Sequence, residues 1–302
     1  MATKQITTWA EFKTALTETI TENTTYEIMN DIDVSGEVLT GSINIVSGQT
    51  KTINGNDHKI NGLTHYSNFG VFNRALAGVK IVFNNLHFSN FMIQSGYLFN
   101  FSARPSSADY YTTFNNCYFS GLVNRLFSAA NSSYSTYTNF NRCSFNVQTN
   151  MLLYAPQGCS FSNCYIIINP MEGTTSCVLW YRGGQSYYPA ISNCYVTGAL
   201  YIPYDTSNYI IGGAFWNNGS CYHNVFNVEI HITNYSASTT YYWTGGSPPD
   251  DRAELYNSDK IYDNAGNKIT MGVRNNFYGL TDAQLKSKTA INQNAPHFPL
   301  WG

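Results

Sequence analysis

The sequence Phe-Asn-Asn-Cys-Tyr-Phe at residues 114–119 recurs in altered form along the middle of the chain. Each copy has apolar residues at its first, fourth and sixth positions, and Asn usually occupies the third. Successive copies start 31, 26, 21, 30 and 31 residues apart. Such a period predicts a solenoid in which each interval holds one coil. The other copies are residues 83–88, 140–145, 161–166 and 191–196, with a weaker one at 222–228.

A second apolar run follows each of the first four copies, at residues 97–99, 126–127, 151–153 and 178–180. Motif and run together therefore recur in tandem, which is typical of a structural repeat. The alternation of apolar and polar residues predicts strands whose alternate side chains point inward. We therefore expect Phe119 and Leu152 to face an apolar interior.

The third position of each copy is where the chain is predicted to bend sharply. Asn tolerates the left-handed backbone conformation that such a bend requires, and its amide can bond to the Asn one coil above. Arg142 interrupts this series, so we expect the chain to bend there by another device. The residues expected to align in one column are Asn85, Asn116, Asn163 and Asn193.

The two ends of the chain differ from the repeat. Thr8 and Glu11 form a capping box ahead of an apolar stripe that begins at Trp9 and ends at Ile20, which predicts a helix. Short alternating runs then continue to residue 45, so the helix is expected to cap the first open edge of the sheet. Near the other end, Thr281 is predicted to cap a second, short helix.

These Asn positions and the Cys residues beside them resemble the internal ladders of right-handed parallel β-helix proteins. The resemblance covers roughly residues 40 to 235 and is greatest to the spike, fibre and appendage proteins of phage virions. It implies an all-β fold, a single-stranded right-handed parallel β-helix with an N-terminal capping helix and an irregular α+β tail. The expected segments are 1–40 for the cap, 41–235 for the β-helix and 236–302 for the C-terminal tail or docking segment. The resemblance to phage virion proteins also implies that the protein is a homotrimer.

The composition excludes several classes of protein. Of the 302 residues, 43% are hydrophobic and only 11% are charged, and the net charge is −2. Disorder through high charge is therefore excluded, and a nucleic-acid partner is not expected. We also expect no membrane insertion, because no apolar stretch approaches ~18 residues. The opening residues lack an apolar leader, so synthesis and assembly in the host cytoplasm are expected.

The cysteines predict buried thiols and no metal site. None of the seven Cys forms a C-x-x-C motif, and no nucleotide-binding or hydrolase motif occurs. We therefore expect no cofactor and no metal. The Cys residues at the fourth position should instead form an inward column of small apolar side chains. They are Cys117, Cys143, Cys164 and Cys194.

Catalytic carboxylates are scarce in the repeat. Hydrolysis of a glycosidic bond commonly needs two nearby carboxyl groups, and residues 76–235 contain only four acids. If the protein is an enzyme, Asp205 and Glu172 are the acids that could converge from loops, with Asp109 as a third candidate. The favoured interpretation is that these acids are solvated loop residues.

The longer intervals between copies are rich in aromatic residues. Aromatic rings beside amides and Arg can stack on sugars while the polar groups bond hydroxyls, although subunit contacts and ordinary loop packing also favour Tyr and Trp. Contacts between subunits are the first interpretation of these residues, ligand contacts the second and ordinary loop packing the third. The candidate binding residues are Trp180, Tyr181, Arg182, Tyr187, Tyr188 and Trp216.

Together these features predict a non-enzymatic virion protein, a fibre, spike or head or tail appendage. Its aromatic loops would bind host-surface glycan or protein from a rigid column, and its other partners would be virion proteins and copies of itself. Two alternatives stay open: a polysaccharide depolymerase, lyase or hydrolase, on the same scaffold, and a bacterial surface adhesin.

Overall fold

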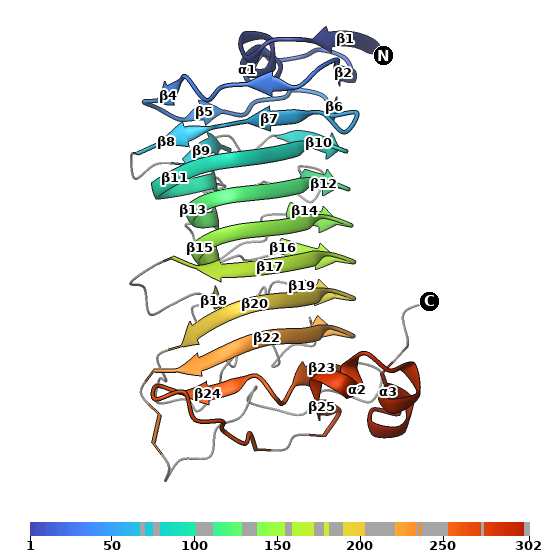
Figure 1. The fold of residues 1–302 in the computed structure, drawn as a ribbon. Coiled ribbons are helices and arrows are strands. Elements are labelled where there is room, and N and C mark those ends of the chain that lie inside the picture. The colour runs from blue at the N-terminus through green and yellow to red at the C-terminus, as the bar shows by residue number, and fades with distance from the viewer. Residues whose placement is uncertain are drawn as a thin grey trace.

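The chain forms a parallel β-solenoid whose coils stack from the N-terminal helix to the C-terminal helices (Figure 1). The predicted all-β parallel architecture with an N-terminal helix is thereby confirmed. The computed structural model describes residues 1–66, 70–74, 79–100, 111–128, 138–154, 159–171, 178–180, 190–202, 221–233, 235–236, 253–272 and 275–298.

Within these ranges, one wall of the solenoid is a nine-stranded parallel sheet. Its strands, in spatial order, are β1 (Ala2–Ile6), β2 (Thr24–Ile28), β6 (Lys51–Asn54), β10 (Lys80–Asn84), β12 (Tyr111–Asn115), β14 (Thr138–Asn141), β16 (Cys159–Ser162), β19 (Ala190–Ser192) and β21 (Cys221–Tyr222).

The described strands of the remaining walls form one sixteen-stranded sheet. Its main path runs through β3 (Ile32–Asp33), β7 (Lys59–Asn61), β11 (His87–Asn100), β13 (Tyr118–Ser128), β15 (Ser144–Tyr154), β17 (Tyr165–Pro170), β20 (Tyr195–Ile202), β22 (Val225–Ile232), β23 (Glu254–Asn257) and β25 (Phe277–Leu280). The strands beside this path are β4 (Val38–Leu39), β5 (Ile43–Asn44), β8 (Thr64–His65), β9 (Gly70–Asn73), β18 (Val178–Trp180) and β24 (Ile261–Asp263).

Stacked aromatic rings fill the interior. The first residue of the motif gives one stack, in which the rings of Phe83 and Phe114 lie 4.8 Å apart and 6° from parallel. The sixth residue gives a second stack, with Phe119 and Phe145 4.9 Å apart. Both stacks follow from parallel pairing in register, because equivalent side chains then sit one strand spacing apart.

The predicted left-handed bends are present at the third position of the five stronger copies, whereas in the weaker copy at 222–228 the left-handed residue is His223, at the second position. Asn85, Asn116, Asn163 and Asn193 have φ values of 48°, 52°, 57° and 52°. The expectation for Arg142 was wrong, since it adopts the same conformation with φ of 54°. A bulky side chain is tolerated because it points into solvent at the bend, so the coil needs the backbone conformation and not the amide.

Amide ladders run along the outside of these bends. The side chain of Asn116 donates to that of Asn85 at 2.7 Å. In the neighbouring column, Asn84 donates to Asn54 at 3.0 Å, and Asn54 in turn donates to Glu27 Oε1 at 2.8 Å. A carboxylate in β2 thus accepts the last hydrogen bond of this ladder.

The N-terminal end is covered by α1 (Trp9–Thr17), which begins with the predicted capping box of Thr8 and Glu11. Its other end is held by the buried Lys51, whose ammonium donates to the carbonyls of Ala15 at 2.6 Å and Glu18 at 2.5 Å. Burial lowers the pKa of Lys51 to about 8. The cap is therefore tied to the solenoid by a cation at the negative end of the helix.

The tail continues the sheet before it becomes helical. β23 pairs with β22, and β25 pairs with β23. The chain then forms α2 (Asp282–Leu285), with the predicted Thr281 cap, and α3 (Lys288–Asn294).

The four motif cysteines are buried free thiols, as predicted. Each thiol donates to a carbonyl of the preceding coil, as from Cys143 to Phe114 at 3.3 Å. Burial raises the pKa of Cys143, and a hydrogen bond to the Cys143 side chain, together with burial, raises that of Cys164 to about 12.

Replacing Cys164 with Ala should reduce the loss of stability at alkaline pH. An unfolded thiol ionises near its ordinary pKa of 9.0, whereas folded Cys164 holds its proton to about pH 12. Its stabilising contribution is therefore complete below pH 9 and falls as the pH rises. Urea denaturation between about pH 10 and about pH 11 should show a slope smaller by about 1.4 kcal/mol per pH unit in the variant. An unchanged slope would mean that the folded thiol is already ionised.

Candidate functional site

The structure tests none of the site residues predicted from sequence. Of Trp180 it describes the backbone alone, in β18. All others lie outside the described residues: the candidate acids Asp109, Glu172 and Asp205, and the candidate binding residues Tyr181, Arg182, Tyr187, Tyr188 and Trp216.

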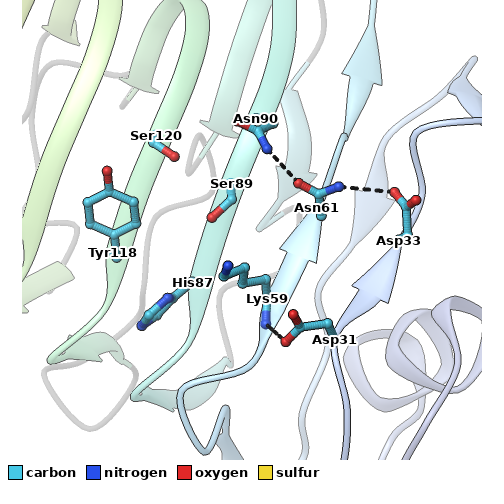
Figure 2. A pocket seen from close by; sticks show the side chains of 9 residues that line it. All are labelled: Asp31, Asp33, Lys59, Asn61, His87, Ser89, Asn90, Tyr118 and Ser120. Atoms are coloured by element: carbon cyan, nitrogen blue, oxygen red, sulfur yellow. Dashed lines mark hydrogen bonds between the residues drawn. The ribbon is translucent and has the colours of Figure 1, made fainter.

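A groove of about 520 Å³ lies elsewhere, on the outer face of the sixteen-stranded sheet. It crosses four neighbouring coils, through the segments that include β3, β7, β11 and β13 (Figure 2). We call it the polar groove. Its lining residues are Asp31, Asp33, Lys59, Asn61, His87, Ser89, Asn90, Tyr118 and Ser120.

Strand register brings these residues together from distant parts of the chain. His87 lies opposite Lys59 on one side and Tyr118 on the other. In the next outward column, Asn61 lies between Asp33 and Ser89. Because outward positions alternate with inward ones along each strand, both columns lie on the groove side of the sheet while the intervening residues fill the core. Within the second column, Ser89 lines the groove but is only 7% exposed.

A β-bulge adds Asn90 to the groove. The pairing of β11 with β13 shifts register between Phe88 and Phe91, and Asn90 has a left-handed φ of 53°. Its amide donates to Asn61 Oδ1 at 2.8 Å, while the amide of Asn61 donates to Asp33 at 3.1 Å (Figure 2). The bulge therefore aims one additional side chain into the groove and fixes the orientation of Asn61.

Both carboxylates of the groove are engaged by neighbouring groups. Asp31 accepts from the backbone N–H of Lys59 at 3.1 Å, and its Oδ1 lies 3.2 Å from His58 Nδ1. These contacts lower the pKa of Asp31. The backbone N–H of Ser35 and the Asn61 amide similarly lower the pKa of Asp33. Both groups are thus ionised acceptors at neutral pH and poorly suited to protonate a leaving group.

Several donors in the groove remain available to a ligand. Among the described residues, neither the Lys59 ammonium nor the hydroxyls of Ser89, Ser120 and Tyr118 have a hydrogen-bond partner. The Tyr118 ring meets His87 edge to face, at 5.7 Å between ring centroids. The groove therefore combines a cation whose charge is partly offset by Asp31, three hydroxyls without a hydrogen-bond partner among the described residues, and an aromatic edge on a parallel sheet.

The described ranges hold no group of three His, Cys, Asp or Glu side chains placed to bind a metal ion. No helix in the same ranges is long and apolar enough to span a membrane.

The repeat itself contains a signal for the groove that sequence reasoning missed. The fifth position of the motif is polar or aromatic and gives His87, Tyr118, Ser144, Tyr165 and Tyr195. All of these belong to one outward column. Asp31 and Asp33 precede the repeat, so motif spacing alone could not place them beside it.

Comparison with known proteins adds a partial match. A family model described as "Putative pectate lyase-like adhesive domain" matches residues 3–123. This range is less than half of the chain and contains every residue of the polar groove. No curated protein sequence matches the chain. Among solved structures, it is similar to one from Bacteroides ovatus described as a "putative immunoglobulin A1 protease". That likeness has 13% identity and a TM-score of 0.44, and covers 96% of this chain and 86% of that chain.

Proposed function

We propose that the protein is a non-enzymatic attachment protein that binds a surface glycan in the polar groove. The observation that carries the proposal is a set of donors on three neighbouring coils that have no hydrogen-bond partner among the described residues, namely the Lys59 ammonium and three hydroxyls. Sugars present many hydroxyls in a fixed arrangement, and converging polar groups recognise them. Because the sheet holds these groups in place beforehand, little conformational entropy is lost on binding.

The family match supports this assignment. The matched model is described as an adhesive domain, and its range includes the whole groove. The ionised state of Asp31 and Asp33 also favours binding over acid catalysis.

Glycan binding by the groove can be measured with two pyranose series, oligogalacturonides and maltooligosaccharides. We expect a hexasaccharide of at least one series to bind with Kd below about 1 mM. Replacing Lys59 with Met should weaken that binding about tenfold, because charged hydrogen bonds contribute about 1.5–3 kcal/mol. Titration calorimetry measures both values.

Lys288→Met is the matched control, since Lys288 is an exposed lysine of α3 outside the groove. It should bind like the unmodified protein. If neither series binds, or if both lysine variants lose affinity equally, the groove is not the glycan site.

For the biological setting we propose an appendage of a phage virion, assembled in the host cytoplasm as a homotrimer and attached to other virion proteins. The four buried free thiols support assembly in a reducing compartment. The low charge and the resemblance of the repeat to phage β-helices support the same setting. Mass measurement in solution and detection of the protein in purified particles test it.

The second candidate is a bacterial surface adhesin, which the description of the matched family favours. Detection of the protein on bacterial cells instead of virus particles would support the adhesin.

A depolymerase would release reducing ends or unsaturated products from the saccharides that the protein binds, and the binding experiment can monitor both.

A further inference from the structure

A row of aromatic side chains continues the polar groove toward the C-terminal end. Strand register places Ser144 opposite Tyr118, Tyr165 opposite Ser144, and Tyr195 opposite Tyr165. All four residues occupy the outward fifth position of the motif. The column that begins with Lys59 and His87 thus extends without interruption for four further coils.

The far end of the row is a stacked pair of rings. The rings of Tyr165 and Tyr195 lie 5.5 Å apart and 14° from parallel. The residue Tyr165 is 44% exposed, so a large aromatic surface faces solvent there. The amide of Asn227 donates to Tyr195 Oη at 2.6 Å and fixes the orientation of that ring. The exposed Tyr165 ring, which stacks on the fixed ring of Tyr195, can receive the apolar face of a sugar.

Ser144 leaves a gap in the row. It separates Tyr118 from Tyr165 by two coil spacings, roughly 10 Å at the usual distance between strands. Beside the gap, Asn169 donates to Asn146 at 3.3 Å on the same outer face. A small side chain flanked by amides and by two tyrosines provides room for sugar units between the groove and the stacked pair.

The row ends at Tyr195. The next residue in the column, Val225, is 7% exposed and belongs to a buried apolar cluster. Tyr195 itself packs against this cluster together with Leu285 of α2 and Ile291 of α3. The surface from Asp31 to Tyr195 therefore has a definite end, and spans roughly 30 Å over six coil spacings.

We propose that Tyr165 and Tyr195 form a stacking subsite for the same glycan that the polar groove holds. The ligand is then an extended pyranose oligosaccharide lying along the solenoid axis, with one end at the groove and the other on the tyrosine pair. This inference rests on the proposed function and adds the length and orientation of the ligand.

Dependence on ligand length tests the subsite. With dimers to octamers of the oligogalacturonide and maltooligosaccharide series, affinity should rise with length until the ligand reaches Tyr165. Tyr165→Ala should then weaken hexamer and octamer binding about tenfold, the loss expected for one aromatic stacking contact. It should leave dimer binding unchanged, because a dimer in the groove does not reach Tyr165.

Two further variants separate stacking from folding. Tyr165→Phe keeps the ring and should retain the affinity for the hexamer. Tyr66→Ala removes a tyrosine that is 50% exposed outside the row and should have no effect on binding. Thermal melting of all three variants reports whether the fold is intact.

The outcomes distinguish this inference from the function on which it rests. If Lys59→Met weakens binding but Tyr165→Ala leaves hexamer binding unchanged, the groove binds glycan and the tyrosine subsite is refuted. If affinity does not depend on length, the subsite is refuted as well. If no oligosaccharide of either series binds the unmodified protein, both the proposed function and the subsite are refuted.

Discussion

Phe119→Asp should prevent the protein from folding. Phe119 is completely buried, and its ring stacks between those of Phe88 at 5.4 Å and Phe145 at 4.9 Å. An Asp there would place an unpaired carboxylate in an apolar stack. It would also remove the contacts of Phe119 with five aromatic rings, two of them stacked. We expect a loss of at least about 4 kcal/mol, comparable to the whole stability of many domains. Soluble yield and far-ultraviolet circular dichroism measure the effect.

Tyr118→Asp is the matched control, because the neighbouring side chain points out of the sheet into the polar groove. It should fold, with a change in the free energy of unfolding below about 1 kcal/mol. Equal yield and equal melting of the two variants would show that the assignment of inward and outward faces is wrong. The side chain of Leu152, also predicted to face inward, lies outside the described residues.

Gly198→Ala should separate two strands of the sheet. Gly198 has φ of +104°, and a Cβ atom there would lie 1.9 Å from the carbonyl oxygen of Ile168 and 2.8 Å from its carbonyl carbon. These are backbone atoms of β17, which pairs with β20 at this position. The strands must therefore move apart, and we expect a loss of about 3 kcal/mol or more. Urea denaturation measures it.

Two other glycines separate the clash from the backbone strain. Gly266 has φ of +83°, but a Cβ atom there would meet no atom within 4 Å, so Gly266→Ala should cost only about 1–2 kcal/mol. Gly36 has the same open surroundings without a left-handed φ, and Gly36→Ala should be nearly neutral. A similar cost at Gly198 and Gly266 would mean that strain, and not the clash with β17, dominates.

The fold could be predicted from sequence because each coil repeats the same physical requirements. Apolar residues at alternate positions define the buried face, and a left-handed residue defines the bend. The conformation of Arg142 shows the limit of that reasoning. The predicted amide ladder suggested that the bend requires Asn. The coil requires only a residue that can adopt a positive φ with its side chain in solvent.

The polar groove could not be located in the same way. Asp31 and Asp33 precede the first copy of the motif, and their neighbours Lys59 and Asn61 join them only through strand register. Asn90 lines the groove because of a β-bulge, and the spacing of residues in the sequence does not predict that bulge. Sequence reasoning favoured aromatic residues between the copies, whereas the described aromatic row lies within the motif itself, at its fifth position.

The in-register column that joins the polar groove to Tyr165 has a consequence for how such a protein can diverge. Duplicating or deleting one coil between β13 and β17 would preserve every stack and ladder. It would, however, change the distance between the polar groove and Tyr165 by one strand spacing, ~4.8 Å. The distance between the two binding regions would therefore change only in steps of one strand spacing. If the protein binds an extended glycan as proposed, recombination within the repeat could fit it to glycans of different length while the side chains at each end stayed the same.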